Sequence, residues 1–188
     1  MAQEIRDKKR AQVIDVLNKA HALELQAIIQ YMHQHYSLAD MDYGVLAANI
    51  KLIALDEMNH AEMFAERVKE LDGEPITEPA GPSERRQDVR TIFAFDAKLE
   101  DDAIAAYNQF LLVCRENGDS TSVKLFEAII DEEQIHFNYF DNVSAHIQKL
   151  GETYLAQIAG TPSDIGPETP GFVARQAAGG AQGGAAGA

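Results

Sequence analysis

The amino-acid sequence predicts an all-α protein built as a bundle of four long helices. Three observations lead to this fold class. Four stretches keep a helical period of apolar residues without Pro or Gly in their interiors, a long Pro- and Gly-rich connection separates the second stretch from the third, and alternating β-branched runs bounded by hairpin turns are absent. Helices with one apolar stripe bury it against each other, which favours an antiparallel bundle.

The first helix is expected from Glu4 to about Ser37, and the second extends to Leu71 after the turn-like segment SLADMDYG. The next segment, DGEPITEPAGPSERR, contains three Pro and two Gly, which the interior of a helix does not tolerate. Its length suits a crossover that returns the chain to the same end of the bundle, because antiparallel neighbours need only a short turn.

The third and fourth helices are expected over about 87–116 and 120–150, separated by the segment ENGD. Gly118 is a natural helix stop in that segment, and Asp119 or Ser120 can cap the helix that follows. A short fifth helix is expected in the segment ETYLAQIA.

Composition bounds the number of domains and the kinds of partner. With 188 residues and 46% hydrophobic content, the chain can bury one substantial core, and we expect one domain over residues 1–160. Residues 161–188 are rich in Gly and Ala and predict a flexible tail, because they offer too little apolar bulk to offset the entropy of ordering. The formal net charge of −14 argues against a nucleic-acid partner and favours cations.

Cysteine usage and hydropathy bound the cellular setting. A single cysteine, Cys114, leaves no disulfide framework and no all-Cys metal site, and we expect it to be a small buried apolar residue. The charged N-terminus lacks the apolar core of a secretory signal, and no run reaches the roughly 18 apolar residues that span a membrane. We therefore expect a cytoplasmic protein without membrane association.

A constellation of glutamates and histidines is repeated along the chain. Each of two Glu-x-x-His motifs is preceded by a further glutamate, and the spacing between the two glutamates is the same in both cases. The residues are Glu24, Glu57 and His60 in the first set and Glu100, Glu133 and His136 in the second. Each residue of the first set precedes its counterpart in the second by the same number of residues, and we call this number the repeat offset. In addition, the midpoint between the two glutamates of each set falls in an expected turn.

This spacing predicts a metal site inside the bundle. Residues equidistant from the turn of a helical hairpin lie at one level, and i, i+3 residues share a helix face, so all six side chains are expected to converge in the apolar core. Burying four carboxylates without compensation costs several kcal/mol per charge, whereas two divalent cations neutralise them. Carboxylate and imidazole ligands suit Fe, Mn or Zn, and the pattern alone does not rank these metals.

The segments LELQAIIQY, DEMNHAEMFAER and DEEQIH, with the Leu-Glu pair at 99–100, resemble the bacterioferritins, and LGETYLAQIAG is similar to their final short helix. The match covers about residues 8–160. It implies a ferritin-like four-helix bundle with the long B–C crossover, and a ferroxidase that oxidises Fe(II) with O₂ or peroxide at a dinuclear iron site. It also implies mineral storage in a hollow homo-oligomer of about 24 subunits and a small electron-transfer partner for iron release.

The resemblance also assigns roles by position. The six repeated residues match the iron ligands, with Glu57 and Glu133 as the bridging carboxylates. Tyr31 matches the aromatic residue beside the site, and the resemblance implies that it donates an electron during oxidation. A core tyrosine with a hydrogen-bonded hydroxyl is the alternative explanation.

Met58 follows Glu57 directly and is therefore rotated about 100° off the core stripe, onto a flank of the bundle. The flank is apolar and indicates an interface between subunits; it consists of Leu25, Ile29, Met32, Leu55 and Met58. The resemblance implies that haem lies on a two-fold axis there, with Met58 of each subunit as an axial ligand. Simple packing of Met58 at a dimer contact is the alternative.

The remaining histidines lack a matched partner spacing and are expected at the surface or at an interface: His21, His33, His35 and His146. Two other functions stay open. Dinuclear bundles also serve as peroxidases, oxygenases and manganese catalases, although a single cysteine excludes a Cys-rich electron-transfer module within this chain. A haem-linked shell that stores iron without a fast dinuclear centre is the non-catalytic alternative.

Overall fold

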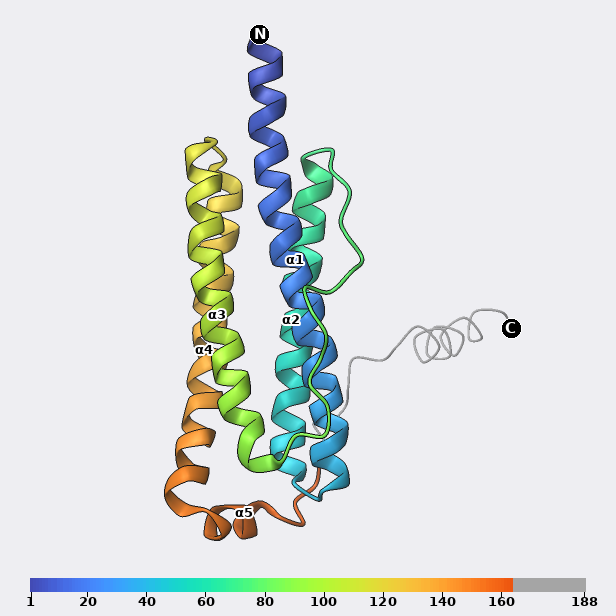
Figure 1. Ribbon diagram of the computed structural model, residues 1–188, viewed down its shortest axis with the longest axis vertical. Helices are drawn as coiled ribbons and strands as arrows, with labels where there is room; N and C mark the ends of the chain where they lie inside the picture. Colours follow the sequence, from blue (N-terminus) through green and yellow to red (C-terminus); the bar gives the residue numbers. More distant parts are fainter. Residues whose placement is uncertain (164–188) are drawn as a thin grey trace, which may run out of the picture.

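The computed structural model describes residues 1–163 and confirms the all-α fold (Figure 1). It contains five helices in the order α1 (Ala2–Asp40), α2 (Gly44–Glu70), α3 (Val89–Glu116), α4 (Ser120–Leu150) and α5 (Glu152–Ile158). No β-strand occurs within this described part, where pairing is limited to one isolated bridge between Tyr43 and Thr161. The expected flexible tail lies outside the described residues from position 164 onward.

The predicted helix boundaries differ most from the structure at the first turn. Residues 37–40 continue α1 instead of forming part of the turn. The helix ends where Asp42 adopts φ 66° and the backbone N–H of Tyr43 donates to the carbonyl of Leu38 at 2.9 Å. At the start of α3, the carboxylate of Asp88 accepts a hydrogen bond from the backbone N–H of Arg90 at 2.8 Å and caps the helix.

The second hairpin turn is built as the sequence predicts. Gly118 adopts φ 77° after α3, and the side chain of Asp119 accepts hydrogen bonds from the backbone N–H groups of Thr121 and Ser122 at the start of α4. Arg67 of α2 donates to both carboxylate oxygens of Asp119 at 2.9 Å. This ion pair ties the end of the first hairpin to the turn of the second.

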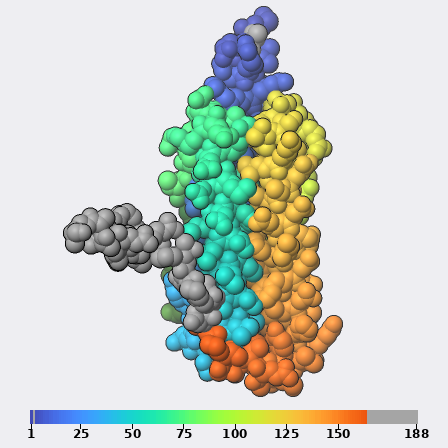
Figure 2. Space-filling model, turned by 180° about the vertical axis from the view of Figure 1, so that it is seen from behind, coloured from blue at the N-terminus to red at the C-terminus, as the bar shows by residue number. Residues whose placement is uncertain are grey.

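Helices α1 and α2 form one antiparallel hairpin, and α3 and α4 form the other. The two turns lie at opposite ends of the bundle, and the connection between α2 and α3 runs along the bundle from one end to the other (Figure 1). On the opposite side, α2 and α4 lie next to each other (Figure 2). No described helix is long and apolar enough to cross a membrane.

Two amide side chains of α1 hold the crossover against the bundle. Asn18 donates to the carbonyl of Glu74 at 3.1 Å and accepts from the backbone N–H of Ile76 at 3.2 Å. Gln30 accepts from the backbone N–H of Glu84 at 2.7 Å and donates to its carbonyl at 3.3 Å. The crossover lacks regular structure, and these bonds satisfy backbone groups that no helix or sheet satisfies.

The core consists of two apolar clusters, one toward each end of the bundle. One contains Tyr31, Phe93 and Phe140, and the other contains Phe64, Tyr107 and Phe126, with further aliphatic side chains in each. A layer of buried carboxylates and imidazoles lies between the two clusters. This layer is the candidate functional site.

Candidate metal centre

The structure brings together all six side chains of the repeated constellation. They come from four different helices, and each is at most 5% exposed: Glu24 (α1), Glu57 and His60 (α2), Glu100 (α3), Glu133 and His136 (α4). Charged side chains are almost never buried to this degree unless they are paired or bind metal. The i, i+3 spacing within each motif and the equal spacing of the two glutamate pairs therefore place the side chains where the sequence predicts.

The six side chains form two overlapping groups of potential metal ligands. One group contains Glu24 and His60, the other contains Glu100 and His136, and both include Glu57 and Glu133. Within each group of four, one ligand atom from each residue lies within 4.8 Å of the others. This arrangement offers two adjacent positions for metal ions, with Glu57 and Glu133 able to bridge them.

The imidazole nitrogens that face the carboxylates are the Nδ1 atoms. Nδ1 of His60 lies 3.0 Å from Glu57 and 3.3 Å from Glu133, and Nδ1 of His136 lies 3.1 Å from each of the same two glutamates. The opposite nitrogens are held by carboxylates near the surface. Nε2 of His60 lies 3.1 Å from Glu132, and Nε2 of His136 lies 3.5 Å from Asp56. Such outer carboxylates orient a metal-binding imidazole and increase its basicity.

The buried groups have strongly shifted pKa values. Burial and neighbouring carboxylates raise the pKa of Glu24 and Glu100 well above the usual range. Burial opposes protonation of the imidazoles, but hydrogen bonds and charges of the glutamates outweigh it and raise the pKa of His60 to about 12 and that of His136 to about 10. The metal-free site therefore holds several protons that bound cations displace.

Two buried tyrosines donate hydrogen bonds to the glutamates of the opposite hairpin. The hydroxyl of Tyr31 donates to Oε1 of Glu100, and the hydroxyl of Tyr107 donates to Oε1 of Glu24 at 2.6 Å. Tyr31 was predicted at the site from the sequence, whereas Tyr107 was not. The repeat offset that relates the ligands also relates Tyr31 to Tyr107, and this signal could have identified the second tyrosine.

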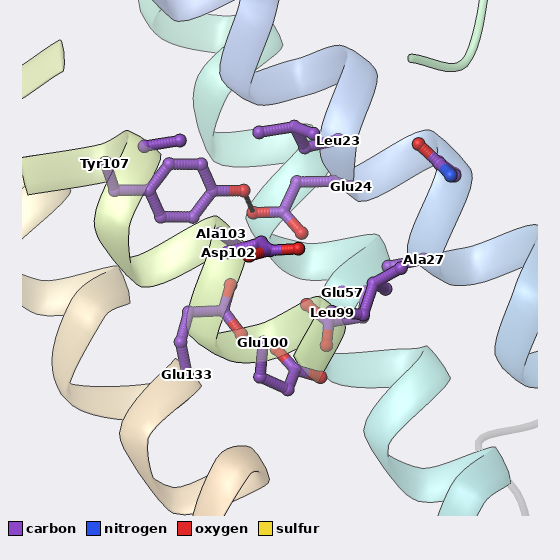
Figure 3. A pocket seen from close by; sticks show the side chains of 12 residues that line it. Leu23, Glu24, Ala27, Glu57, Leu99, Glu100, Asp102, Ala103, Tyr107 and Glu133 are labelled. Atoms are coloured by element: carbon purple, nitrogen blue, oxygen red, sulfur yellow. Dashed lines mark hydrogen bonds between the residues drawn. The ribbon is translucent and has the colours of Figure 1, made fainter. Parts of the chain in front are cut away.

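A cavity of about 220 Å³ leads to the glutamates between α1 and α3 (Figure 3). Its inner end is lined by all four glutamates and by Tyr107. Its outer part contains two polar groups, the carboxylate of Asp102 and the amide of Gln26. The other side chains there are small or aliphatic: Leu23, Ala27, Leu99, Ala103 and Ala106. A space of this size admits small ions and diatomic molecules to the site.

Met58 lies outside this site, on the outer side of α2, where it is 53% exposed. Ile29 is 50% exposed and Leu55 is 37% exposed, while Leu25 and Met32 are half-buried. We call these five side chains the apolar flank. Large apolar side chains gathered on a surface indicate a protein or ligand contact.

One expectation for the other histidines is wrong. His21 is buried between α1 and α2. A hydrogen bond of 3.0 Å between its Nδ1 and the carbonyl of Ala61 on α2 holds the imidazole ring there. His33 and His35 are half-buried and His146 is exposed. Cys114 is fully buried, as expected, and burial raises the pKa of its thiol to about 12.

Comparison with known proteins identifies the family. A model of the ferritin-like domain matches residues 14–156. Bacterioferritin from Desulfovibrio desulfuricans is 60% identical over 168 residues, which are 89% of this chain and 94% of that protein. This chain belongs to the bacterioferritin family. Bacterioferritin from Brucella melitensis is 31% identical over 157 residues, covering 84% of this chain and 98% of that protein.

Solved bacterioferritins have the same fold. A crystal structure of the Desulfovibrio desulfuricans bacterioferritin, which describes its diiron site in different catalytic states, has a TM-score of 0.87 and 59% identity over 89% of this chain and 98% of that one. Bacterioferritin BfrA from Mycobacterium tuberculosis has a TM-score of 0.74 and 33% identity, covering 78% and 93% of the two chains. Membership in the bacterioferritin family makes this chain an iron-storage protein, with a carboxylate and histidine cluster that could hold two metal ions.

Proposed function

We propose that this chain is a ferroxidase that oxidises Fe(II) to Fe(III) at a dinuclear iron site within each subunit and stores the product as mineral. The observation that carries the proposal is the pair of overlapping ligand groups that share Glu57 and Glu133. Four carboxylates and two imidazoles neutralise and bind two divalent cations, and this ligand set is typical of dinuclear carboxylate sites in helical bundles. The Desulfovibrio desulfuricans relative supports iron as the metal, because its structure describes a diiron site.

Within this site, Glu24 and His60 would hold one Fe(II), Glu100 and His136 the other, and the bridging carboxylates both. Fe(II) reaches the site through the cavity between α1 and α3, where Asp102 supplies a negative charge on the way to the buried glutamates. O₂ or peroxide accepts the electrons. Tyr31 lies within hydrogen-bond distance of Glu100 and is proposed to supply a further electron.

We further propose that the Fe(III) mineral accumulates inside a hollow homo-oligomer of about 24 subunits assembled from two-fold dimers in the cytoplasm. The apolar flank supports an interface on the outer sides of α1 and α2, where the exposed Met58 thioether would hold a haem shared by two subunits. Bound haem would supply a one-electron carrier, through which a small electron-transfer protein is proposed to deliver the electrons that release stored iron.

The ferroxidase proposal is tested by Glu24→Ala and Glu100→Ala in the intact protein, measured by stopped-flow absorbance after mixing with Fe(II) and O₂. Each variant is expected to lose rapid Fe(II) oxidation, because each removes a ligand of one metal position. Glu62→Ala, which removes an exposed carboxylate on α2, is the matched control and is expected to react normally. Normal fast oxidation in both ligand variants would favour the alternative of a haem-linked shell that stores iron without a fast dinuclear centre.

A further inference from the structure

Tyr31 and Tyr107 are equivalent in the repeated site but have different surroundings. The Tyr107 ring lies among aromatic rings, with centroids 5.6 Å from Phe64, 5.7 Å from Phe126 and 6.3 Å from Phe110. The ring of Phe140 lies 5.3 Å from that of Tyr31, and Phe140 corresponds to Phe64 through the repeat offset. The positions near Tyr31 that correspond to the other two rings carry Ile50 and Gln34.

Gln34 belongs to a row of polar side chains that occurs on the Tyr31 side alone. Its amide nitrogen donates to Oδ1 of Asp96 at 2.7 Å and to Oε1 of Gln87 at 2.8 Å. Gln30 donates to the same oxygen of Gln87 at 3.0 Å and also bonds to the backbone of Glu84 in the crossover. The row therefore extends from a fully buried carboxyl group, one helical turn from Glu100, to the surface of the bundle.

The corresponding positions around Tyr107 are apolar. Through the repeat offset, Ala20 corresponds to Asp96 and Phe110 corresponds to Gln34. In the same way, Ala11 corresponds to Gln87 and Ala106 corresponds to Gln30. The bundle therefore packs this region with apolar side chains in one half and with polar ones in the other. Because a buried carboxyl group that an apolar residue could replace destabilises the fold, its presence beside Tyr31 calls for a functional explanation.

The hydrogen bonding of this row is incomplete among the described residues. Oδ2 of Asp96 and Oε1 of Gln34 are buried and have no hydrogen-bond partner there. Burial raises the pKa of Asp96 well above the usual range, and the hydrogen bond from Gln34 only partly opposes this. The charge of Asp96 contributes to the raised pKa values of Tyr31 on α1 and Tyr139 on α4, so the carboxyl group is within electrostatic reach of both phenols. A neutral acid beside Tyr31 can therefore lose a proton when the local charge changes.

We propose that Asp96 is a positioning residue that makes Tyr31, and not the equivalent Tyr107, the tyrosine that is oxidised during iron oxidation. The inference rests on the proposed ferroxidase function. When Tyr31 loses an electron to O₂ or peroxide, the hydrogen-bonded pair of Tyr31 and Glu100 keeps its proton and becomes one charge more positive. Asp96 compensates the lost electron by releasing its own proton to solvent, and the amide of Gln34 stabilises the carboxylate that remains.

This step balances in atoms and charge. The starting groups are the hydrogen-bonded pair of Tyr31 and Glu100 and the Asp96 carboxylic acid, and the products are the same pair with one electron fewer and an ionised Asp96. One proton goes to solvent and one electron goes to the oxidant. The hydrogen-bonded pair of Tyr107 and Glu24 could lose an electron in the same way, but Ala20 at the position equivalent to Asp96 has no proton to release.

The test is electron paramagnetic resonance of the full-length protein, frozen shortly after Fe(II)-loaded samples meet O₂ or peroxide. We expect a tyrosyl radical that Tyr31→Phe removes and Tyr107→Phe retains. Asp96→Asn keeps the shape of the side chain and is expected to lower the radical yield about tenfold or more, because the charge left behind in the core is uncompensated. Phe110→Leu, beside Tyr107, is the matched control and should leave the yield unchanged.

Two further readouts separate this role from a merely structural one. The radical yield of the unmodified protein should rise with pH, since proton release to solvent becomes easier, and Asp96→Asn should remove that dependence. In the metal-free protein, the infrared carbonyl band of a protonated buried carboxyl group should lose one component in Asp96→Asn. If Asp96→Asn does not fold, Gln34→Leu, which removes the donor to Asp96, should lower the radical yield instead.

The outcomes also separate this inference from the ferroxidase proposal. Slow Fe(II) oxidation by the unmodified protein would refute the ferroxidase proposal. Fast oxidation with no tyrosyl radical, with a radical on Tyr107, or with an unchanged yield in Asp96→Asn would refute the inference about Asp96 alone.

Discussion

The two hairpins of the bundle carry the same residues at the candidate metal centre and have different exteriors. Inside, α1–α2 and α3–α4 each supply two glutamates, one histidine and one tyrosine at positions related by the repeat offset. Outside, the apolar flank of α1–α2 corresponds to Asp101, Ala105, Asn108, Asp131 and Gln134 on α3–α4. One hairpin therefore presents apolar side chains and a thioether, where the other presents mostly polar ones.

This difference shows which constraints act on each part of the sequence. Two adjacent metal positions of equal chemistry would require equal ligands from both halves, and the repeat is kept at these ligand positions. The proposed contact between subunits would require an apolar surface on α1–α2, and the corresponding positions on α3–α4 are mostly polar. The repeat is thus kept at the candidate metal ligands and lost at the apolar flank and in the row around Asp96.

The largest effect is expected from the bridging glutamates, which test whether the two halves are equivalent inside. Glu57→Gln and Glu133→Gln should each lower the rate of rapid Fe(II) oxidation by about a hundredfold or more, because each removes a carboxylate common to both ligand groups. Stopped-flow absorbance with Fe(II) and O₂ measures the rate, and Co(II) titration counts the metal positions. A large loss in one variant and none in the other would contradict the equivalence.

The next largest effect concerns the exterior. Met58→Gln gives α2 the residue that α4 carries at the equivalent position. If the proposed haem is bound, we expect the purified variant to contain none of it, while the initial rate of Fe(II) oxidation stays within about twofold. Haem is measured by absorbance against protein concentration. Met63→Gln, at another exposed methionine of α2, is the control and should retain haem. Full haem content in Met58→Gln would remove Met58 as the axial ligand.

The protons held by the site predict how metal affinity depends on pH. The pKa values of His60 and His136 are raised to about 12 and about 10, and those of Glu24 and Glu100 are also raised. All four groups must therefore release protons when cations bind. Lower pH leaves more protons to displace, so affinity should fall. We expect the apparent dissociation constant of Co(II), which does not require O₂, to rise by about tenfold or more per pH unit between about pH 8 and pH 6. An affinity that is constant over this range would show that the metal-free site is not protonated.

The smallest effect is expected from the two tyrosines when no electron transfer takes place. Tyr31→Phe and Tyr107→Phe each remove one hydrogen bond to a glutamate and should weaken Co(II) binding by about tenfold, to the same extent in both variants. Isothermal titration at constant pH measures the affinity. Unequal losses would mean that the halves already differ before oxidation, at the level of metal binding.

Much of the fold could be read from the sequence because its signals are local. Helical periodicity, Gly118 and the prolines of the crossover locate the helices and the turns, and Asp119 caps α4 as expected. The six clustered side chains could also be predicted, since a hairpin converts distance from the turn into height along the bundle. The boundary at Asp40 was less accurate, because Leu38 and Asp42 close the helix through a backbone conformation that the sequence does not specify.

Contacts between the hairpins could not be predicted in the same way. The bonds of Tyr31 with Glu100 and of Gln34 with Asp96 join α1 to α3, and they depend on how the second hairpin docks onto the first. Periodicity within one helix shows which face is buried but not which residue of another hairpin lies opposite. His21 was misplaced for a related reason, since its partner is a backbone carbonyl of α2 that a search for repeated side chains cannot detect.

The crossover that runs the length of the bundle also has a consequence for the order of folding. Each hairpin joins helices that are neighbours in sequence, so both can form early and independently, whereas their docking must wait until the long connection and α3–α4 have been synthesised. Each hairpin on its own carries one terminal glutamate, one histidine and one bridging carboxylate, and neither half has the complete ligand group of a single ion. We expect newly made chains to capture redox-active iron only as their final maturation step, which protects the nascent polypeptide from oxidative damage.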